Sequence, residues 1–218
     1  DQITKLTPAD GAAYDYFARS VAISGNTVIV GAMYDDDNGS DSGSAYLFDA
    51  STGDQITKLT PTDGAADDHF GRSVAISGNT AVVGAHGDDD NGSSSGSAYL
   101  FDVTTGNQIA KLTADNGAEG DHFGYSVAIS AGTAIVGAYY NDYSGPNSGS
   151  AYLFDASTGN QIAHLVPYGS ASYDRFGRSV AISDGTAFVG AYFSSDNGSY
   201  SGSAYLFDTS TGNQIAKL

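Results

Sequence analysis

The sequence predicts an all-β fold of the propeller type, and three observations lead to this prediction. A unit of 53 residues occurs four times without insertion or deletion, at 1–53, 54–106, 107–159 and 160–212. Each unit holds four short apolar segments, rich in β-branched and aromatic residues and separated by Gly, Asn, Asp and Ser. No segment keeps the period of an amphipathic helix. A four-stranded antiparallel meander repeated at about 50 residues has the size of one propeller blade.

The second unit illustrates the four expected strands in order. Residues 72–77, RSVAIS, alternate between apolar and polar side chains, and residues 80–85, TAVVGA, form a nearly continuous apolar run. After an acidic loop, residues 97–102, SAYLFD, carry the Tyr and Phe that are typical of strands. A turn then leads to residues 108–112, QIAKL, as the fourth strand. A β-solenoid is the structural rival, but its coils are usually shorter than this unit, which favours a propeller.

The number of fourth strands leaves the closure of the propeller open. The fourth-strand segment QIxKL occurs five times, with His in place of Lys at 161–165, whereas each of the other three strands occurs four times. Its first and last copies, residues 2–6 and 214–218, would compete for one edge in a closed four-bladed ring. A longer repeat array or a multi-chain assembly has no such conflict. We therefore expect one repeat domain over residues 1–218, with 213–218 beginning a fifth unit, either as a closed ring or as part of a larger propeller.

The composition excludes several function classes. The formal net charge of −17 argues against nucleic acids and anionic membrane surfaces as partners, because both require basic patches. No apolar run approaches the roughly 18 residues of a membrane-spanning helix. The sequence has no cysteine, which excludes disulfides and thiolate sites. Acidity at this density suits cation binding or solubility in salty water. No targeting segment is recognisable, so localisation has to be inferred indirectly.

The order of motifs within each unit resembles the FG-GAP repeat. The motifs are F-G-x-S-V-A-I-S, V-V-G-A, G-S-A-Y-L-F and Q-I-x-K-L, and the resemblance covers all four units. It implies a β-propeller like the head of integrin α-subunits, and an extracellular or cell-surface location. The first unit departs from the pattern with Phe17-Ala18 in place of Phe-Gly. In every unit another residue replaces the Pro that usually follows Gly-Ala: Met33, His86, Tyr139 and Tyr192.

The acidic loops are candidate calcium sites, although not at the family's usual position. Integrin-type repeats carry an Asp-rich calcium loop between the first and second strands, where this chain has only short turns such as SGNT. Its acidic residues lie between the second and third strands, as in YDDDNGSDSG (34–43) and GDDDNGSSSG (87–96). Ca²⁺ takes roughly six to eight oxygen ligands, and alternate residues of a turn can face one ion. The other interpretation is a solvated turn in which Asp and Asn cap backbone N–H groups. The candidate ligands are Asp35, Asp37, Asp88, Asp90, Asp142 and Asp196.

Three other polar patterns recur. An Asp stands two residues before the Phe that recurs in each unit. We expect it to accept hydrogen bonds from backbone N–H groups where the chain enters the first strand: Asp15, Asp68, Asp121 and Asp174. The triplet Asn-Gly-Ser matches the N-glycosylation sequon and is also a natural turn sequence; it begins at Asn38, Asn91 and Asn197. The four histidines form no metal-ligand spacing, so we expect packing or surface roles for them: His69, His86, His122 and His164.

The sequence points to binding and not to catalysis. Unusual residues are spread evenly over the units, and nothing resembles an oriented triad or a phosphate-binding loop. We therefore expect a non-enzymatic, secreted or surface-exposed module for adhesion, assembly or ligand binding through its loops, with a protein or glycan as partner. The alternative is a glycan-binding propeller, or a propeller-based hydrolase or lyase that acts on polysaccharide. Its signature would be a cluster of non-repeating residues at one rim, for which the divergent fourth unit offers Tyr168, Tyr173, Arg175, Arg178 and Phe193.

Overall fold

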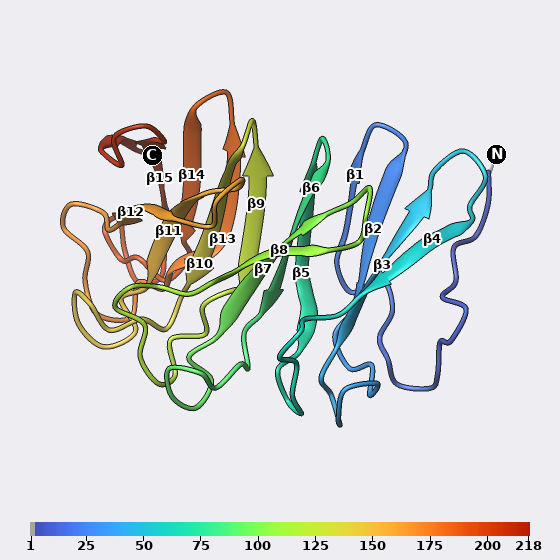
Figure 1. Ribbon diagram of the computed structural model, residues 1–218. Coiled ribbons are helices and arrows are strands. Elements are labelled where there is room, and N and C mark those ends of the chain that lie inside the picture. Colours follow the sequence, from blue (N-terminus) through green and yellow to red (C-terminus); the bar gives the residue numbers. More distant parts are fainter. Residues whose placement is uncertain (1–2) are drawn as a thin grey trace.

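A computed structural model describes residues 3–218, which form four antiparallel four-stranded sheets and contain no helix (Figure 1). We call these sheets blades 1 to 4. Blade 1 holds β1 (Val21–Ser24), β2 (Thr27–Ala32), β3 (Ser44–Asp49) and β4 (Gln55–Leu59). Blade 2 holds β5 (Phe70–Ser77), β6 (Thr80–Ala85), β7 (Ser97–Asp102) and β8 (Gln108–Leu112). Blade 3 holds β9 (Ser126–Ser130), β10 (Thr133–Ala138), β11 (Ser150–Asp155) and β12 (Gln161–Leu165). Blade 4 holds β13 (Phe176–Ser183), β14 (Thr186–Ala191), β15 (Ser203–Asp208) and β16 (Gln214–Lys217).

The predicted meander is confirmed in every unit, because each strand pairs with the next one along the chain. The inner strands pack in series, β1 against β5, β5 against β9, and β9 against β13. This is the arrangement of a β-propeller, in which the first strand of each blade lies nearest the axis. Since the described residues form no helix, they contain no helical segment that could cross a membrane.

The hydrophobic core lies between the blades and not within one sheet. Ile29 and Leu47 of blade 1 are fully buried against Phe70 and Val83 of blade 2. The same contacts recur between blades 2 and 3 and between blades 3 and 4. The Tyr and Phe of each SAYLFD strand pack edge-on against the Phe that begins the blade, with ring centroids 5.6 and 5.8 Å away in blade 2. A single blade would leave these apolar faces in water, so each blade depends on packing against a neighbour.

One glycine in each second strand sets how closely the blades approach. A Cβ atom at Gly31 would lie 2.0 Å from the carbonyl oxygen of Gly71 in the next blade. At Gly84 the corresponding distance to the oxygen of Gly124 would be 1.9 Å. Real Cβ atoms do not come so close to a carbonyl, so only glycine permits this spacing.

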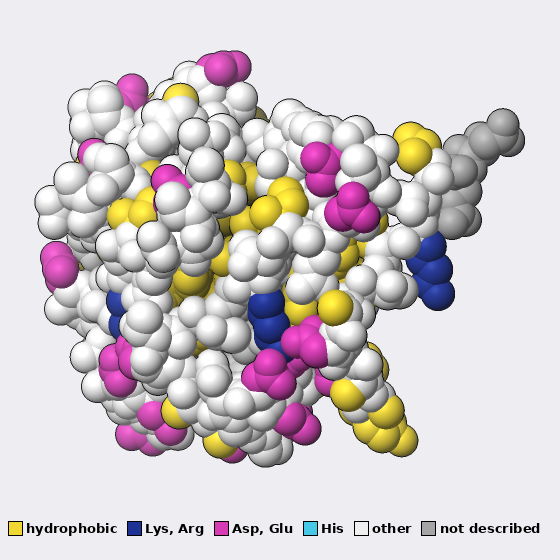
Figure 2. All heavy atoms as spheres, turned by 45° about the vertical axis from the view of Figure 1, so that its right-hand side comes forward, with side chains coloured by type: hydrophobic (Ala, Val, Ile, Leu, Met, Phe, Trp, Pro, Cys, Tyr) yellow, Lys and Arg dark blue, Asp and Glu magenta, His cyan; other side chains and the backbone are white. Residues whose placement is uncertain are grey.

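The four blades form an open arc and not a closed ring. Phe188 of blade 4 is 39% exposed, whereas its counterpart Ile29 in blade 1 is fully buried. On the other end, Ile23 of blade 1 is 63% exposed, whereas its counterpart Ile76 is 8% exposed. Blades 1 and 4 lie on opposite sides of Figure 1, and apolar side chains gather on the face that Figure 2 turns forward. Gly190 accordingly has no carbonyl of a following blade near the position of a Cβ atom.

The two competing QIxKL segments differ in structure. Residues 214–217 form β16 and pair with β15. Residue 2 lies outside the described residues, and residues 3–6 form no strand. They still occupy the place expected from the repeat, because the side chain of Thr4 lies against Gly53 as that of Thr57 lies against Gly106.

We expect Gly84→Ala to lower the free energy of unfolding by about 3 kcal/mol, because its methyl group would collide with the backbone of blade 3. In the matched variant Gly190→Ala the new methyl group meets only Ser179, whose counterpart Ser73 also adjoins Gly84. We expect this variant to lose less than about 1 kcal/mol of unfolding free energy. Urea unfolding of both variants measures the difference. Equal losses would contradict the open arc, because they would require a covered face on blade 4.

Candidate functional site

One rim of the arc is built where the loop after each second strand meets the segment that leads into the next blade. The backbone N–H groups of Asp67, His69 and Phe70 donate to the carbonyl oxygens of Ser40, Asp41 and Ser42 at 2.8 to 3.1 Å. The same ladder recurs at the two following junctions. At one equivalent position of all four lead-in segments the residue lies in the left-handed region, with φ between 49° and 56°: Tyr16, His69, His122 and Arg175. The rim therefore presents one side chain per blade from a fixed backbone.

These side chains and their neighbours form a continuous row across all four blades, which we call the aromatic row. Ring centroids of successive aromatic members lie 5.0 to 5.4 Å apart. One guanidinium completes the row, 5.0 Å from the ring centroid of Tyr140 and 4.6 Å from that of Phe193. In order, the row consists of Tyr16, Tyr34, His69, His86, His122, Tyr140, Arg175, Phe193 and Tyr200.

The three histidines at the centre of the row are held neutral. Burial, followed by the neighbouring His69, His122 and Arg72, lowers the pKa of His86 to about 3. Burial also lowers the pKa of His69, although Asp41 and Asp67 oppose the change, and it lowers the pKa of His122. The Nδ1 atoms of all three are buried without a hydrogen-bond partner among the described residues. At neutral pH this part of the row is thus a stack of uncharged rings with free nitrogen atoms.

A cavity of about 250 Å³ lies on the axis side of the inner strands, and we call it the arginine groove. Its charged lining residues are Arg19, Arg72 and Arg178, and none of the residues that line it is acidic. Tyr125 stands at the equivalent position of blade 3, with the guanidinium carbons of Arg72 and Arg178 4.1 and 4.3 Å from its ring centroid. The ring of Tyr125 also lies 5.5 Å from that of His86. The groove therefore adjoins the inner side of the aromatic row.

Two of the candidate metal loops surround a lysine. In blade 2, Lys111 Nζ lies 2.8 Å from carboxylate oxygens of Asp63 and Asp88 and also contacts Asp90. Asp88 is buried and accepts hydrogen bonds of 2.9 Å from the hydroxyls of Ser97 and Tyr99. Burial would lower the pKa of Lys111, but its hydrogen bonds with the three carboxylates raise it overall. For Asp88 burial opposes the change, and the bond with Lys111 lowers the pKa.

Blade 1 repeats this cluster. Lys58 Nζ lies 2.8 Å from Asp10 and 3.1 Å from Asp35, and it also contacts Asp37. The ammonium group stands at the point where the three carboxylates converge, so a divalent cation could bind there only by displacing it. The residues predicted as metal ligands in blades 1 and 2 thus do come together, but around a lysine that the sequence prediction did not include.

The other two blades depart from this cluster in different ways. In blade 3, Asn141 replaces the buried Asp, Tyr143 replaces the exposed one, and His164 replaces the Lys. His164 stacks on Tyr152 at 4.6 Å, and burial lowers its pKa to about 4. In blade 4, Ser194 replaces the buried Asp, while Asp196 pairs with Lys217. Blade 3 thus loses the carboxylates and the lysine together, whereas blade 4 keeps its lysine paired with one exposed carboxylate, so each lysine of the cluster has a counter-charge.

The two remaining candidate ligands do not assemble a site with other carboxylates. Asp142 is exposed, and its carboxylate accepts the backbone N–H of Asn147 at 2.6 Å. Asp196 accepts the hydroxyls of Ser194 and Ser203 in addition to its bond with Lys217. These contacts are those of a capped turn, the alternative interpretation of these loops.

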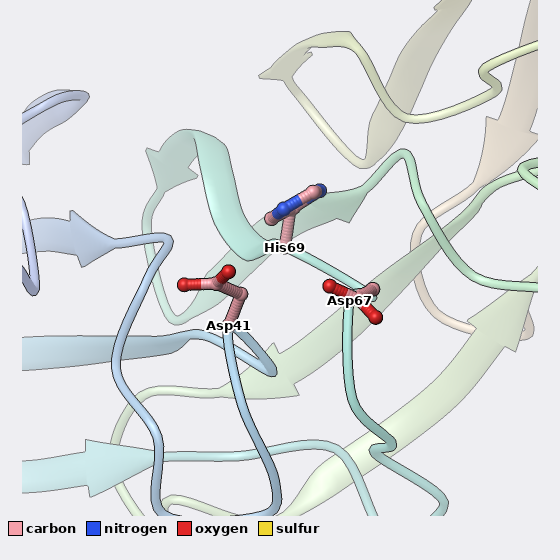
Figure 3. A group of neighbouring side chains, drawn as sticks. All are labelled: Asp41, Asp67 and His69. Atoms are coloured by element: carbon pink, nitrogen blue, oxygen red, sulfur yellow. The ribbon is translucent and has the colours of Figure 1, made fainter.

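A second acidic group contains no lysine. One potential ligand atom from each of Asp41, Asp67 and His69 lies within 4.8 Å of the others. Figure 3 shows that the three side chains project from two neighbouring segments, the loop of blade 1 and the lead-in to blade 2. No other junction repeats this set, since the equivalents of His69 are accompanied by Ser94 and Gly120 or by Asn147 and Tyr173. The carboxylates belong to turns on the rim, and among residues 3–218 neither forms an ion pair.

The remaining polar predictions have defined surroundings. Each Asp that precedes the first strand accepts the N–H three residues upstream at 2.6 to 2.9 Å, as predicted for Asp15, Asp68, Asp121 and Asp174. The three sequon asparagines are exposed in loops, and a serine hydroxyl accepts the backbone N–H of each: Asn38, Asn91 and Asn197. Glycosylation at these positions stays a prediction.

Sequence reasoning found only part of the rim. Of the set named in the fourth unit, Arg175 and Phe193 belong to the aromatic row, and Tyr173 lines a cavity beside Phe193. Arg178 lies in the arginine groove instead, and Tyr168 is exposed outside both. The expectation of packing or surface roles for the histidines overlooked their alignment. Reading the repeats as columns would have revealed it, because three neighbouring columns hold mostly aromatic residues and one holds Arg19, Arg72, Tyr125 and Arg178.

The comparisons with known proteins agree with this fold. The sequence profile of the FG-GAP repeat matches residues 1–48, 54–101, 107–154 and 160–207. No curated protein matches the sequence significantly. Among solved structures, the computationally designed Ika4 protein has a TM-score of 0.59 and 16% identity, over 95% of this chain and 98% of that one. The designed Ika8 protein has a TM-score of 0.56 and 17% identity, over 93% of this chain and 61% of that one. The hydrazine synthase of Kuenenia stuttgartiensis has a TM-score of 0.61 and 14% identity, over 97% and 52% of the two chains. At these identities the likeness concerns the fold alone.

We expect Lys111→Met to lower the free energy of unfolding by about 3 kcal/mol, because it leaves the buried carboxylate of Asp88 without its counter-charge. The variant should also acquire stabilisation by millimolar Ca²⁺, since three carboxylates would then be free to bind an ion. Thermal unfolding with Ca²⁺ and with a chelator measures both effects.

The control imports the set found in blade 3 as Asp63→Asn, Asp88→Asn, Asp90→Tyr and Lys111→His. It should cost less than the single Lys111→Met change and show no Ca²⁺ response. A wild-type protein that already gains stability from Ca²⁺, as much as Lys111→Met does, would contradict the view that the lysine fills this position.

Proposed function

Because this chain belongs to the FG-GAP repeat family, we propose that it is a non-enzymatic, extracellular binding module that holds a glycan along its aromatic row. One observation carries the proposal: the row is continuous over all four blades, although the residues that form it differ from blade to blade. A core position would repeat the same residue, as the Tyr and Phe of the SAYLFD strands do.

The chemistry of the row suits a sugar chain. Aromatic rings offer apolar faces and, in Tyr and His, polar edges, so one surface can contact both the C–H groups and the hydroxyls of a sugar. Tyr16 is 60% exposed and Tyr200 is 68% exposed, one at each end of the row. The row extends over several blades, and an extended oligosaccharide is long enough to contact the whole of it. Aromatic side chains have few rotatable bonds, so they lose little conformational freedom when they bind a ligand.

Binding is favoured over catalysis by the way the ionisable groups are used. The buried carboxylates of blades 1 and 2 are engaged by lysines, and the histidines of the row lie at ring-stacking distances from one another. The group formed by Asp41, Asp67 and His69 comes nearest to the clustered residues expected of an enzyme. It contains no nucleophile of the kind found in triads. The proposal is therefore a module that retains its ligand without turnover.

A second candidate function is assembly, which the exposed face of blade 4 favours. Phe188, Gly190 and Gly202 stand where the internal blades use Ile or Val and the same two glycines to pack against a following blade. The other end of the arc is less suited to such packing. A Cβ atom at Gly71 would lie 2.2 Å from the carbonyl oxygen of Ser44, and blade 1 carries Ala18 at this position. Blade 4 thus fits a repeat that begins with Phe-Gly better than it fits blade 1 of a second copy.

We expect Tyr34→Ala and Tyr140→Ala each to weaken binding of an oligosaccharide by about tenfold, which corresponds to about 1.4 kcal/mol per lost ring contact. An array of neutral and acidic hexasaccharides identifies the bound sugar, and titration calorimetry measures the affinity. The matched control is Tyr143→Ala, which removes a tyrosine that is 65% exposed and packs on His164 outside the row. Release of reducing ends from the bound sugar, or equal losses in the control, would contradict the proposal.

We expect Ala18→Gly to promote head-to-tail association, because it removes the methyl group that opposes the carbonyl oxygen of a docked blade. Residues 3–6 would have to give way to β16 of the neighbouring copy, and they form no strand that would resist this. Sedimentation velocity compares the variant with the wild-type chain of 22.2 kDa. Adding Phe188→Asp should reverse the association, and identical sedimentation of Ala18→Gly and wild type at all concentrations would refute assembly through this face.

A further inference from the structure

We propose that the arginine groove binds an oxyanion, carboxylate or sulfate, so that the ligand of the aromatic row is an acidic polysaccharide. This inference deepens the proposed function and rests on it for the polysaccharide, but the oxyanion site itself rests on separate observations. They concern where the positive charges of the chain lie, what they contact, and what the groove lacks.

The chain has only eight basic residues against 25 acidic ones, and it places them in two different ways. Three of its four lysines, Lys58, Lys111 and Lys217, are bonded to carboxylates. None of the arginines forms an ion pair with a carboxylate among residues 3–218. Three of the four arginines line one groove. The protein has a net charge of −17, yet this groove has three arginines and no acidic residue, so its local charge is positive.

Two of the three guanidinium groups of the groove are held in place by stacking. Arg72 and Arg178 both lie over the ring of Tyr125, and Arg178 also lies 5.5 Å from the ring centroid of Tyr139. A stacked guanidinium satisfies its face but keeps its N–H groups in the plane of the group, at its edge. In the described part of the chain no carbonyl or carboxylate oxygen accepts a hydrogen bond from the side chain of Arg19, Arg72 or Arg178, and the polar partner of Arg72 is the hydroxyl of Tyr125. These edges are free to donate in pairs to a planar carboxylate or to a sulfate.

The positive charges that line the groove repel one another unless an anion binds between them. Burial, together with Arg19 and Arg178, lowers the pKa of Arg72, while Tyr125 partly offsets the change. An oxyanion in the groove would relieve this repulsion for three guanidinium groups at once, which is why arginine clusters recognise such groups. The hydroxyls of Ser73 and Ser126 are not free to contribute, because they donate to the carbonyl oxygens of Gly124 and Gly177 at 2.8 Å.

The position of the groove links it to the sugar site. Tyr125 lies between two arginines. Its ring centroid is 5.5 Å from that of His86 and 4.4 Å from that of Tyr139. A sugar unit stacked at the centre of the row would therefore direct a carboxylate or sulfate substituent toward the groove. A neutral glycan has no group that matches three guanidiniums, whereas uronic acid chains and sulfated chains carry one on many of their units. The groove therefore gives the row its selectivity for acidic chains.

The experiment compares four probes by titration calorimetry at one fixed ionic strength: inorganic sulfate, an oligogalacturonate hexamer, a sulfated galactan hexamer and neutral laminarihexaose. We expect the wild-type protein to bind at least one acidic hexamer at least tenfold more tightly than the neutral one. Arg72→Gln should abolish most of this difference, and Arg72→Gln with Arg178→Gln should abolish all of it. The carboxylate and sulfate arms show which oxyanion the groove prefers.

Two controls separate the groove from general charge and from the row. Lys5→Gln removes the same single charge at an exposed lysine outside the groove and should leave the preference unchanged. Tyr34→Ala should weaken neutral and acidic hexamers alike. Arg72→Lys keeps the charge but loses the paired donors, so an intermediate affinity is expected.

The outcomes for the groove and for the row are distinguishable. If acidic hexamers bind the double arginine variant as tightly as the wild type, the oxyanion site is refuted while the proposed function stands. If no hexamer binds the wild type, the proposed function fails, and sulfate decides the groove alone. Millimolar sulfate should then raise the melting temperature of the wild type and not of the double variant, and equal shifts in both proteins would overturn the inference.

Discussion

The close approach of backbone to backbone at the blade junctions is the constraint on which the rest of the structure depends. A glycine in the second strand of blades 1 to 3 faces a carbonyl oxygen of the next blade at a distance that excludes a Cβ atom. This contact sets the spacing between blades, and it allows the apolar faces around Ile29, Leu47, Phe70 and Val83 to meet without a gap. The rim inherits the same spacing, so that rings of successive units, Tyr34 with His69 and His86 with His122, come into contact although they are 35 and 36 residues apart in the chain. The aromatic row is thus a product of core packing and of side-chain choice at the rim together.

The lysine–aspartate clusters show how a strongly acidic repeat keeps buried carboxylates. Asp35 and Asp88 are buried, and each is matched by a lysine from the outer strand of the same blade and by hydroxyls from the third strand. Blade 3 removes the acids and the lysine together and fills the space with His164 stacked on Tyr152. A buried ion pair contributes little net stability against such an apolar replacement, but either partner alone is costly. Blade 4 lacks the buried carboxylate but keeps Lys217 with the exposed Asp196, so a lysine is kept only where a carboxylate remains to pair with it.

The fold could be predicted from the sequence because it repeats one local pattern, and the sites could not because they arise between units. The strand around Val74 and Ile76 and the strand around Tyr99 and Phe101 follow from alternation and β-propensity within one unit. Reading the acidic loops alone brought Asp88 and Asp90 together, but it missed Lys111, which lies 21 residues beyond Asp90 and joins them only after the meander has folded. The stack of His69, His86 and His122 joins the second unit to the third, and a search for ligand spacing within a strand could not detect it. Closure also depends on geometry between units, namely how far each blade is rotated from the last, which the repeat length does not specify.

The rim separates the part of each repeat that folds from the part that varies. One of its columns, represented by His69, His122 and Arg175, rests on backbone hydrogen bonds to the preceding blade, which do not depend on the identity of the side chain, and on a left-handed conformation that disfavours β-branched residues. Substitutions by residues that are not β-branched should therefore cost little stability in this column, whereas the glycines at the blade junctions and the apolar strands beneath them tolerate few changes. Duplication of such a unit adds one further blade that already folds, and with it one further position for recognition. Ligand preference in this architecture can evolve blade by blade, through independent substitutions whose effects on folding are small.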